Sequence, residues 1–145
     1  MERAFQLAKI AGSKGEVPVG AVIVFEDKII GEGYNTKEST QVVSRHAEML
    51  AIEQACQKLG SWRLNNCQLY VTLEPCLMCA GAIYQSRIEK VIVGAKDPKA
   101  GATGSLYEVH NDKRLNHNFI VEEHPLKDDC SALLKEFFKK RRTKA

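Results

Sequence analysis

Two cysteines, Cys76 and Cys79, stand three residues apart directly after Pro75, at the start of a predicted helix. At this spacing both sulfurs would lie on one face of the first helical turn. Free backbone N–H groups and the positive end of the helix dipole favour thiolate there, which is the form that binds metals. A redox pair and half of a structural zinc site would use the same spacing, so the pair alone leaves both open.

A histidine and a glutamate at the start of another predicted helix, His46 and Glu48, narrow the choice. A closed zinc site normally needs a second ligand pair, and the sequence contains no second C-x-x-C and no H-x-x-x-H. His46, Cys76 and Cys79 instead form a three-ligand set suited to Zn²⁺, with a fourth position for water, as in catalytic sites. Zinc lowers the pKa of water from about 15.7 toward 7, and a carboxylate such as Glu48 could take the released proton.

Alternating strands and helices are predicted to position these residues. Two runs rich in β-branched residues indicate an antiparallel hairpin near the N-terminus. A later strand–helix–strand unit favours parallel pairing through a right-handed crossover. The predicted helices cover 4–11, 46–59, 76–86 and the segment after Pro125, and the predicted strands cover 19–25, 29–34, 68–73, 90–95 and 118–123.

These elements indicate an α/β protein with a three-layer α/β/α architecture, in which helices cover both faces of a mixed central β-sheet. We expect a single domain over residues 1–145, because a chain of this length buries roughly 68–70 % of its unfolded surface. The last helix carries apolar residues in the i, i+3, i+4, i+7, i+8 pattern of a core-facing stripe. These residues are Cys130, Leu133, Leu134, Phe137 and Phe138.

The five cysteines and the hydropathy pattern indicate a cytoplasmic protein. An odd number of cysteines argues against a disulfide framework. Cys56 and Cys130 fall on apolar helical faces and are predicted to be small core residues, whereas Cys67 stays open as a spare metal ligand. No apolar run approaches the roughly 20 residues that span a bilayer, and the N-terminus does not resemble a signal peptide.

The formal net charge of +3 is concentrated at the C-terminus, where residues 139–144 hold five cations and leave −2 on the rest of the chain. Such a segment is usually a solvated helix end whose cations complement the helix dipole. It would bind phosphates if the active site acts on nucleic acid. Lys139, Arg141 and Arg142 are then the expected contacts to the RNA backbone.

The combined pattern H-x-E…P-C-x-x-C is a known signature of zinc-dependent nucleobase deaminases. The segments HAEMLAIE, VTLEPCLMCAGAIYQSRIEKVIVGAKDPKAGATGSL and LNHNF resemble the bacterial tRNA-specific adenosine deaminases of the cytidine/deoxycytidylate deaminase superfamily. The resemblance extends from EVPVGAVIV to LLKEFFKKRR, nearly the whole chain. One departure lies directly before His46, where Val42–Arg45 replace the Asp-Pro-Thr-Ala that is common in the family.

This resemblance implies a cytidine-deaminase-like fold, a homodimer whose sites are completed across the interface, and one Zn²⁺ per subunit. It implies hydrolytic deamination of adenosine to inosine at the wobble position of a tRNA anticodon stem-loop, with Glu48 as the catalytic proton carrier. The metal ligands are then His46, Cys76 and Cys79. The implied substrate-binding residues are Asn35, Ala47 through its backbone amide, Asp97, Lys99 and Asn116.

Two other functions would use the same residues. A deaminase of a free base or nucleotide, such as guanine, cytosine or deoxycytidylate, would share the zinc and the glutamate. A non-catalytic RNA-binding module would hold zinc only as a staple, with Cys67 or a histidine as fourth ligand. The salt dependence of binding distinguishes the first alternative, and replacement of Glu48 distinguishes the second.

Overall fold

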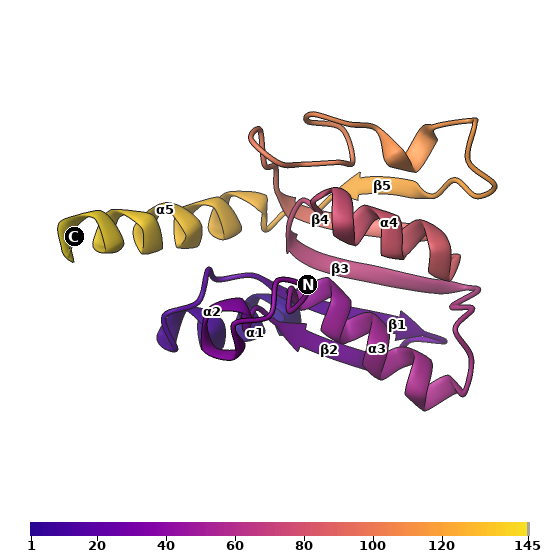
Figure 1. Cartoon of the computed structure of the whole chain (residues 1–145), viewed down its shortest axis with the longest axis horizontal. Helices are drawn as coiled ribbons and strands as arrows, with labels where there is room; N and C mark the ends of the chain where they lie inside the picture. Colours follow the sequence, from indigo (N-terminus) through magenta and orange to yellow (C-terminus); the bar gives the residue numbers. More distant parts are fainter. Residues whose placement is uncertain (145) are drawn as a thin grey trace.

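The computed structural model describes the backbone of residues 1–144 and the side chains of residues 1–142. Its strands and helices alternate along the chain, as expected for an α/β protein (Figure 1). The strands are β1 Gly20–Phe25, β2 Lys28–Tyr34, β3 Cys67–Leu73, β4 Lys90–Ala95 and β5 Ile120–Glu123. The helices are α1 Glu2–Ser13, α2 Lys37–Thr40, α3 Ala47–Leu59, α4 Leu77–Ser86 and α5 Lys127–Lys144, with a 3-10 turn η1 at Val109–Asn111.

The five strands form one mixed sheet in the order β2-β1-β3-β4-β5. β1 pairs antiparallel with both β2 and β3, whereas β3, β4 and β5 pair in parallel. The mixed sheet and the parallel β3-α4-β4 unit predicted from the sequence are therefore confirmed. The tight turn between β1 and β2 places Glu26 and Asp27 at φ values of 50° and 63°, the left-handed backbone that a type I′ hairpin requires.

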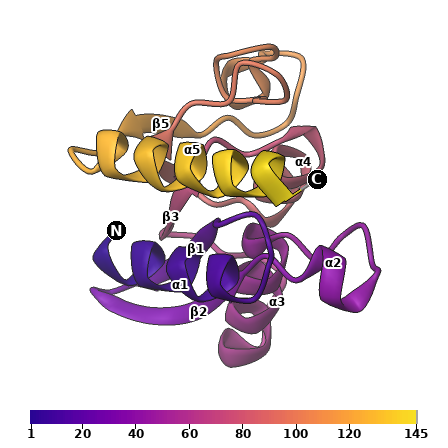
Figure 2. The same cartoon turned by 90° about the vertical axis from the view of Figure 1, so that its left-hand side faces the viewer.

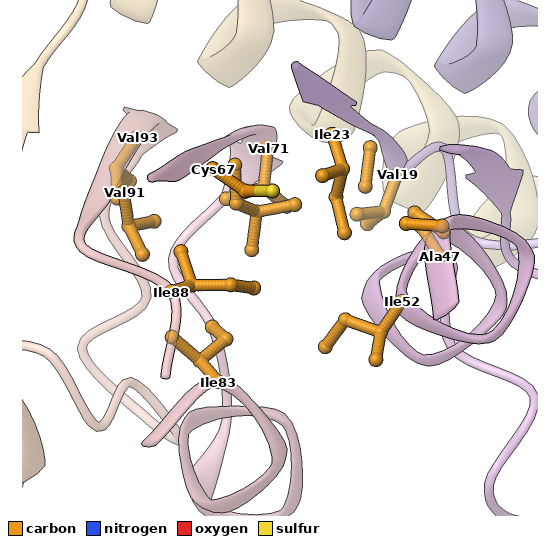
Figure 3. Packing of buried hydrophobic residues seen from close by; sticks show 14 of the residues in the cluster. Val19, Ile23, Ala47, Ile52, Cys67, Val71, Ile83, Ile88, Val91 and Val93 are labelled. Atoms are coloured by element: carbon orange, nitrogen blue, oxygen red, sulfur yellow. The ribbon is translucent and has the colours of Figure 1, made fainter. Parts of the chain in front are cut away.

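Helices cover both faces of the sheet, which confirms the expected three layers. α3 and α4 pack against one face, and α1 and α5 lie on the other (Figures 1 and 2). The main core lies between the sheet and the α3–α4 layer, where Ile52, Ile83 and Ile88 approach the valines of the strands (Figure 3). A smaller apolar cluster around Leu7 and Val22 lies between α1 and the sheet.

Two glycines of β2 determine how closely α3 approaches the sheet. A Cβ added at Gly31 would overlap the carbonyl oxygen of Ala51, and one added at Gly33 would overlap that of Ala47. The helix surface opposite these glycines consists of buried alanines. Small residues on both sides bring the two backbones together, and this contact holds the start of α3, which follows His46, against the sheet.

The last helix, α5, only partly matches its prediction. Cys130 and Leu134 are buried, but Leu133 and Phe137 are half-buried and Phe138 is 41 % exposed. The prediction of a core-facing stripe is therefore wrong for the C-terminal half, because α5 extends beyond the strands that its first turns cover (Figure 1). Neither α5 nor any other helix in the described part of the chain has the length and apolar character needed to cross a membrane.

Candidate active site

The candidate site lies at one edge of the sheet, where two helices begin. β2, β3 and β4 run in the same direction, so their C-terminal ends meet at this edge. α3 follows β2 through the segment 35–46, and α4 follows β3 through the segment 74–76. In open α/β sheets this edge is the usual location of a ligand site.

Three side chains converge between the two helix starts. His46 is the N-cap residue of α3, Cys76 is the N-cap residue of α4, and Cys79 lies in the first turn of α4. Nδ1 of His46 lies 3.7 Å from Sγ of Cys76 and 3.5 Å from Sγ of Cys79. All three ligand atoms lie within 4.8 Å of one another, and no other group of three His, Cys, Asp or Glu side chains among the described residues is this compact.

The protonation of this cluster suits cation binding. Hydrogen bonds from the Cys79 thiol and from His46 lower the pKa of Cys76 to about 4, against the opposing effect of burial. The bond to Cys76, together with burial, raises the pKa of Cys79, and the bond to Cys76 also raises the pKa of His46. A bound cation would displace the protons on Cys79 and His46, because thiolate and neutral imidazole are the ligating forms. Two thiolates and one imidazole fit Zn²⁺.

Glu48 lies beside this cluster in the first turn of α3 and is 4 % exposed. Burial raises its pKa to about 7, because the low-polarity surroundings disfavour the charged carboxylate. Its own backbone N–H and the neighbouring His46 stabilise the charge only in part. A carboxyl group with a pKa near neutrality can both accept and donate a proton under physiological conditions, which suits general acid–base catalysis.

A pocket of about 190 Å³ opens over Glu48, His46 and Cys76. Its volume is below the roughly 300 Å³ at which typical small-molecule pockets begin, so it has room for one base rather than for a polynucleotide. The pocket is bounded on one side by the segment around α2 and on the other by the segment after β4. Its lining residues are Glu16, Val17, Val19, Asn35, Lys37, Glu38, His46, Glu48, Leu73, Glu74, Cys76, Asp97 and Ala100.

Asn35 and Ala47, two predicted substrate-binding residues, contact each other. The Ala47 backbone N–H donates a 2.9 Å hydrogen bond to Oδ1 of Asn35, and Nδ2 of Asn35 donates to the carbonyl oxygen of Val17 at 3.2 Å. Asn35 thus ties the end of β2 to the first residue of α3 while it lines the pocket. One Nδ2 hydrogen and one Oδ1 lone pair are left over after these two bonds.

Of the other three predicted substrate-binding residues, two lie at the pocket and one does not. Asp97 lines the pocket, and its Oδ1 accepts hydrogen bonds from the backbone N–H groups of Lys99 and Ala100, so the exposed Lys99 lies at the pocket rim. Asn116 lies elsewhere. The neighbouring His117 shares a 2.8 Å hydrogen bond with the carbonyl oxygen of Ile88, before β4 begins. Since β4 spans about 20 Å, the structure does not bring Asn116 to the pocket of its own subunit.

Two further pocket carboxylates, Glu16 and Glu74, received no role from the sequence although both stand in the segments that carry the family resemblance. Glu16 is 2 % exposed and accepts hydrogen bonds from the backbone N–H groups of Glu38 and Ser39, at the start of α2. Glu74 is 4 % exposed and binds the segment after β4. The available signal was an acidic residue next to an apolar strand, but the sequence does not show which distant N–H groups it binds.

The remaining cysteines lie outside the cluster. Cys67 begins β3, at the opposite end of the strand from the site, and burial raises its pKa to about 11. The prediction that Cys67 could serve as a spare metal ligand is therefore wrong, because β3 separates it from His46 by its full length. Cys130 is buried as expected, whereas Cys56 is only half-buried.

The predicted RNA-backbone residues Lys139, Arg141 and Arg142 are exposed on the last turns of α5. The guanidinium group of Arg141 lies 5.6 Å from the ring centroid of Phe137. In both views the C-terminal end of α5 lies at the end of the molecule that also carries α2 (Figures 1 and 2). The side chains of Thr143 and Lys144, which complete the basic segment, lie outside the described residues.

Comparison with known proteins places this geometry in a family. Residues 1–142 match the family of MafB19-like deaminases. The chain is 48 % identical to the tRNA-specific adenosine deaminase of Bacillus subtilis (strain 168) over 99 % of this chain and 89 % of that protein. It is 50 % identical to the tRNA-specific adenosine deaminase of Aquifex aeolicus (strain VF5), over 96 % of this chain and 91 % of that protein.

Solved structures agree with the sequence comparison. A structure from studies of A-to-I editing by tRNA:A34 deaminases at the wobble position of transfer RNA has a TM-score of 0.89 and 39 % identity, covering 92 % of this chain and 97 % of that one. Guanine deaminase from Nitrosomonas europaea has a TM-score of 0.80 at 23 % identity, covering 94 % and 81 % of the two chains, and shares the fold. The chain therefore belongs to the MafB19-like deaminase family and, within it, to the tRNA-specific adenosine deaminases.

Proposed function

We propose that this chain converts adenosine to inosine at the wobble position of a tRNA anticodon by hydrolytic deamination. The observation that carries the proposal is a buried carboxyl group, Glu48, beside a His–Cys–Cys cluster at the floor of a pocket sized for one base. The substrate follows from relatives at 48 % and 50 % identity that are named tRNA-specific adenosine deaminases. Water and adenosine are consumed, and inosine and ammonia are formed.

His46, Cys76 and Cys79 would hold one Zn²⁺ per subunit. When bound, zinc supplies a Lewis acid that makes water a nucleophile at neutral pH. Because two thiolates and a neutral imidazole cancel the charge of Zn²⁺, the protein must stabilise much of the developing charge with other groups.

Glu48 moves the protons of the reaction. Its carboxylate would take one proton from the attacking water and deliver it to the purine ring nitrogen. It would then take the second proton from the hydroxyl group added at C6 and pass it to the departing amine, which leaves as ammonia. A pKa near 7 supports both directions of transfer. Asn35, which holds the end of β2 against α3, orients the base so that C6 faces the water, and Asp97 closes the other side of the pocket.

The basic end of α5 supplies contacts outside the pocket. Lys139, Arg141 and Arg142 would bind phosphates of the anticodon stem-loop, since a pocket for one base leaves the rest of the RNA on the surface. A role for Asn116 requires the partner subunit, because this residue is remote from its own pocket. An enzyme that acts on tRNA would work in the cytoplasm.

We also propose that the protein is a homodimer formed through α3 and α4. A mainly apolar groove of about 820 Å³ lies between these helices, and its rim carries Trp62 and Leu77, which are 57 % and 54 % exposed. Leu77 and Met78 stand between the two cysteine ligands in the sequence, so a second copy on this groove would adjoin the site. Sedimentation equilibrium should give the mass of a dimer, and Trp62→Glu should shift the protein to monomers. A parent protein that is monomeric at all concentrations would contradict the proposed dimer.

The proposed reaction can be tested with the zinc-loaded protein and two substrates, an anticodon stem-loop with a wobble adenosine and free adenosine. Nucleoside mass spectrometry should find inosine from the stem-loop and almost none from the free nucleoside. Equal turnover of both, or turnover of guanine or a cytosine nucleotide instead, would favour the deaminase of free bases. Zinc-dependent RNA binding without any inosine would favour the non-catalytic module.

A further inference from the structure

The carboxylate of Glu74 accepts hydrogen bonds from several residues of the segment that follows β4. Oε1 accepts a hydrogen bond from the Asp97 backbone N–H at 3.1 Å and a short one from the Ser105 hydroxyl group. Oε2 accepts hydrogen bonds from the backbone N–H groups of Thr103 at 3.0 Å and Ser105 at 3.1 Å. Four donors from one nine-residue stretch therefore converge on a side chain that is 4 % exposed.

The same stretch is folded against the metal ligand. Gly101 forms a β-bridge with Cys76, and the Ala102 N–H donates a 2.8 Å hydrogen bond to the carbonyl oxygen of Pro75. Gly101 passes directly over the carboxylate, where an added Cβ would overlap the Glu74 side chain. The segment that binds Glu74 thus also contacts the backbone of Pro75 and Cys76.

The stretch forms one wall of the pocket. Asp97 and Ala100 line it, and Asp97 is tied to Glu74 through its own backbone N–H. The Asp97 side chain in turn accepts hydrogen bonds from the Lys99 and Ala100 N–H groups and so fixes the turn at the rim. Release of the Glu74 carboxylate would free the Asp97 backbone and, with it, this whole turn.

We propose that Glu74 is a positioning residue for the deaminase reaction, because its carboxylate holds segment 97–105 as the pocket wall against which the substrate base binds. Its partners are all N–H and O–H groups of that segment, and no ion pair involving Glu74 occurs among the described residues. This arrangement needs an acceptor on both oxygens. In Glu74→Gln, an NH₂ group would replace one of the two accepting oxygens and would face hydrogen-bond donors. Only the donors at the remaining oxygen would then have an acceptor. The proposal rests on the function proposed above.

The test compares Glu74→Gln with the parent in three measurements: zinc content, hydrogen exchange of the backbone amides, and KM and kcat on the anticodon stem-loop. We expect one zinc per subunit in both proteins. The Asp97, Thr103 and Ser105 amides should exchange at least about tenfold faster in the variant, because their common acceptor is lost. KM should rise about tenfold while kcat changes by less than about threefold, since the wall binds the base and Glu48 is intact.

Two matched variants separate positioning from a general loss of stability. Val22→Ala removes packing between β1 and α1, remote from the segment, and should lower Tm without changing KM. Ser105→Ala removes one of the four donors and should raise KM by less than Glu74→Gln does. An unchanged KM in Glu74→Gln, or an equal rise in Val22→Ala, overturns the proposal. If the parent itself makes no inosine, the proposed function fails, whereas the exchange data still decide whether Glu74 holds the wall.

Discussion

Glu48 and Glu74 border the same pocket, and each is 4 % exposed, yet their pKa values move in opposite directions. Burial raises the pKa of Glu48 to about 7. Burial also disfavours the charged form of Glu74, but hydrogen bonds from Ser105, Asp97 and Thr103 outweigh this effect and lower its pKa. Glu48 lies deeper in the protein and has few donors, whereas several donors surround the Glu74 carboxylate, so both burial and hydrogen bonding separate the two pKa values.

This difference divides the site into a centre and a rim. At the centre, Glu48 stands on a rigid helix start beside the His–Cys–Cys cluster and can exchange a proton near neutral pH. At the rim, Glu74 keeps its negative charge and uses it to hold a loop. We therefore expect substitutions at the centre to act on kcat and substitutions at the rim to act on KM and stability.

The largest effect is expected for Glu48→Gln. Loss of a positioned general acid–base lowers the rate about 10²- to 10⁴-fold, so kcat for inosine formation should fall by this amount. Zinc content and the circular dichroism spectrum should match the parent, because the proposed ligands His46, Cys76 and Cys79 are intact. A kcat of Glu48→Gln within threefold of the parent value would show that Glu48 is not the general acid–base and that the two carboxylates do not divide into centre and rim.

A smaller effect is expected for Gly101→Ala at the rim. The added Cβ would overlap the Glu74 carboxylate, and such overpacking typically costs about 1–3 kcal/mol of unfolding free energy. Gly12→Ala is a matched control, because its Cβ would be 3.4 Å from Pro18 near the end of α1, in ordinary contact. That control should be neutral or stabilising by up to about 1 kcal/mol. Equal stability of the two variants in denaturant unfolding would contradict the packing described for Gly101.

The salt dependence of RNA binding tests whether the basic end of α5 acts outside the pocket. If Lys139, Arg141 and Arg142 contact three phosphates, affinity for the stem-loop should fall about tenfold for a threefold rise in salt. Replacing all three by glutamine should flatten this slope and leave kcat at saturating RNA unchanged. A flat slope in the parent, measured by fluorescence anisotropy, would instead favour a free base as substrate.

The smallest effect is expected for Glu16, which has two backbone donors. Burial alone would raise its pKa, but the hydrogen bonds from Glu38 and Ser39 lower it below the ordinary value of 4.5. A lowered folded-state pKa adds stability above pH 4.5 that is lost as the pH falls through the folded-state value. The parent should therefore lose up to about 1 kcal/mol more than Glu16→Gln between pH 6 and pH 3. The free energy of unfolding can be measured by urea unfolding at each pH. If it fell equally with pH in the parent and in Glu16→Gln, this prediction would be contradicted.

The sequence predicted the centre of the site better than its rim. His46, Cys76 and Cys79 could be grouped because each lies at a predicted helix start and the three side chains form a ligand set suited to zinc. The helix starts follow from local periodicity, whereas the strand order that brings them to one edge of the sheet was not predicted. The grouping of Glu48 with them follows from its position two residues after His46.

The rim depends on contacts between distant segments, which a single sequence does not show. Segment 35–45 had no periodicity, and its helix α2 is held by Glu16, more than twenty residues earlier. Segment 97–105 is folded around Glu74 in the same way. The C-terminal half of α5 shows the opposite difficulty, because its apolar pattern indicates a buried face but not whether strands extend beneath it.

Position-resolved sequencing of total tRNA tests the proposed function most directly. Inosine pairs with cytosine and is therefore read as guanosine after reverse transcription. Zinc-loaded parent protein should convert adenosine to inosine at the anticodon wobble position of its tRNA substrates and at no other adenosine, whereas Glu48→Gln should leave the reads unchanged. Absence of conversion at any wobble adenosine by the zinc-loaded parent, or the same conversion by Glu48→Gln, would contradict the role assigned to this site.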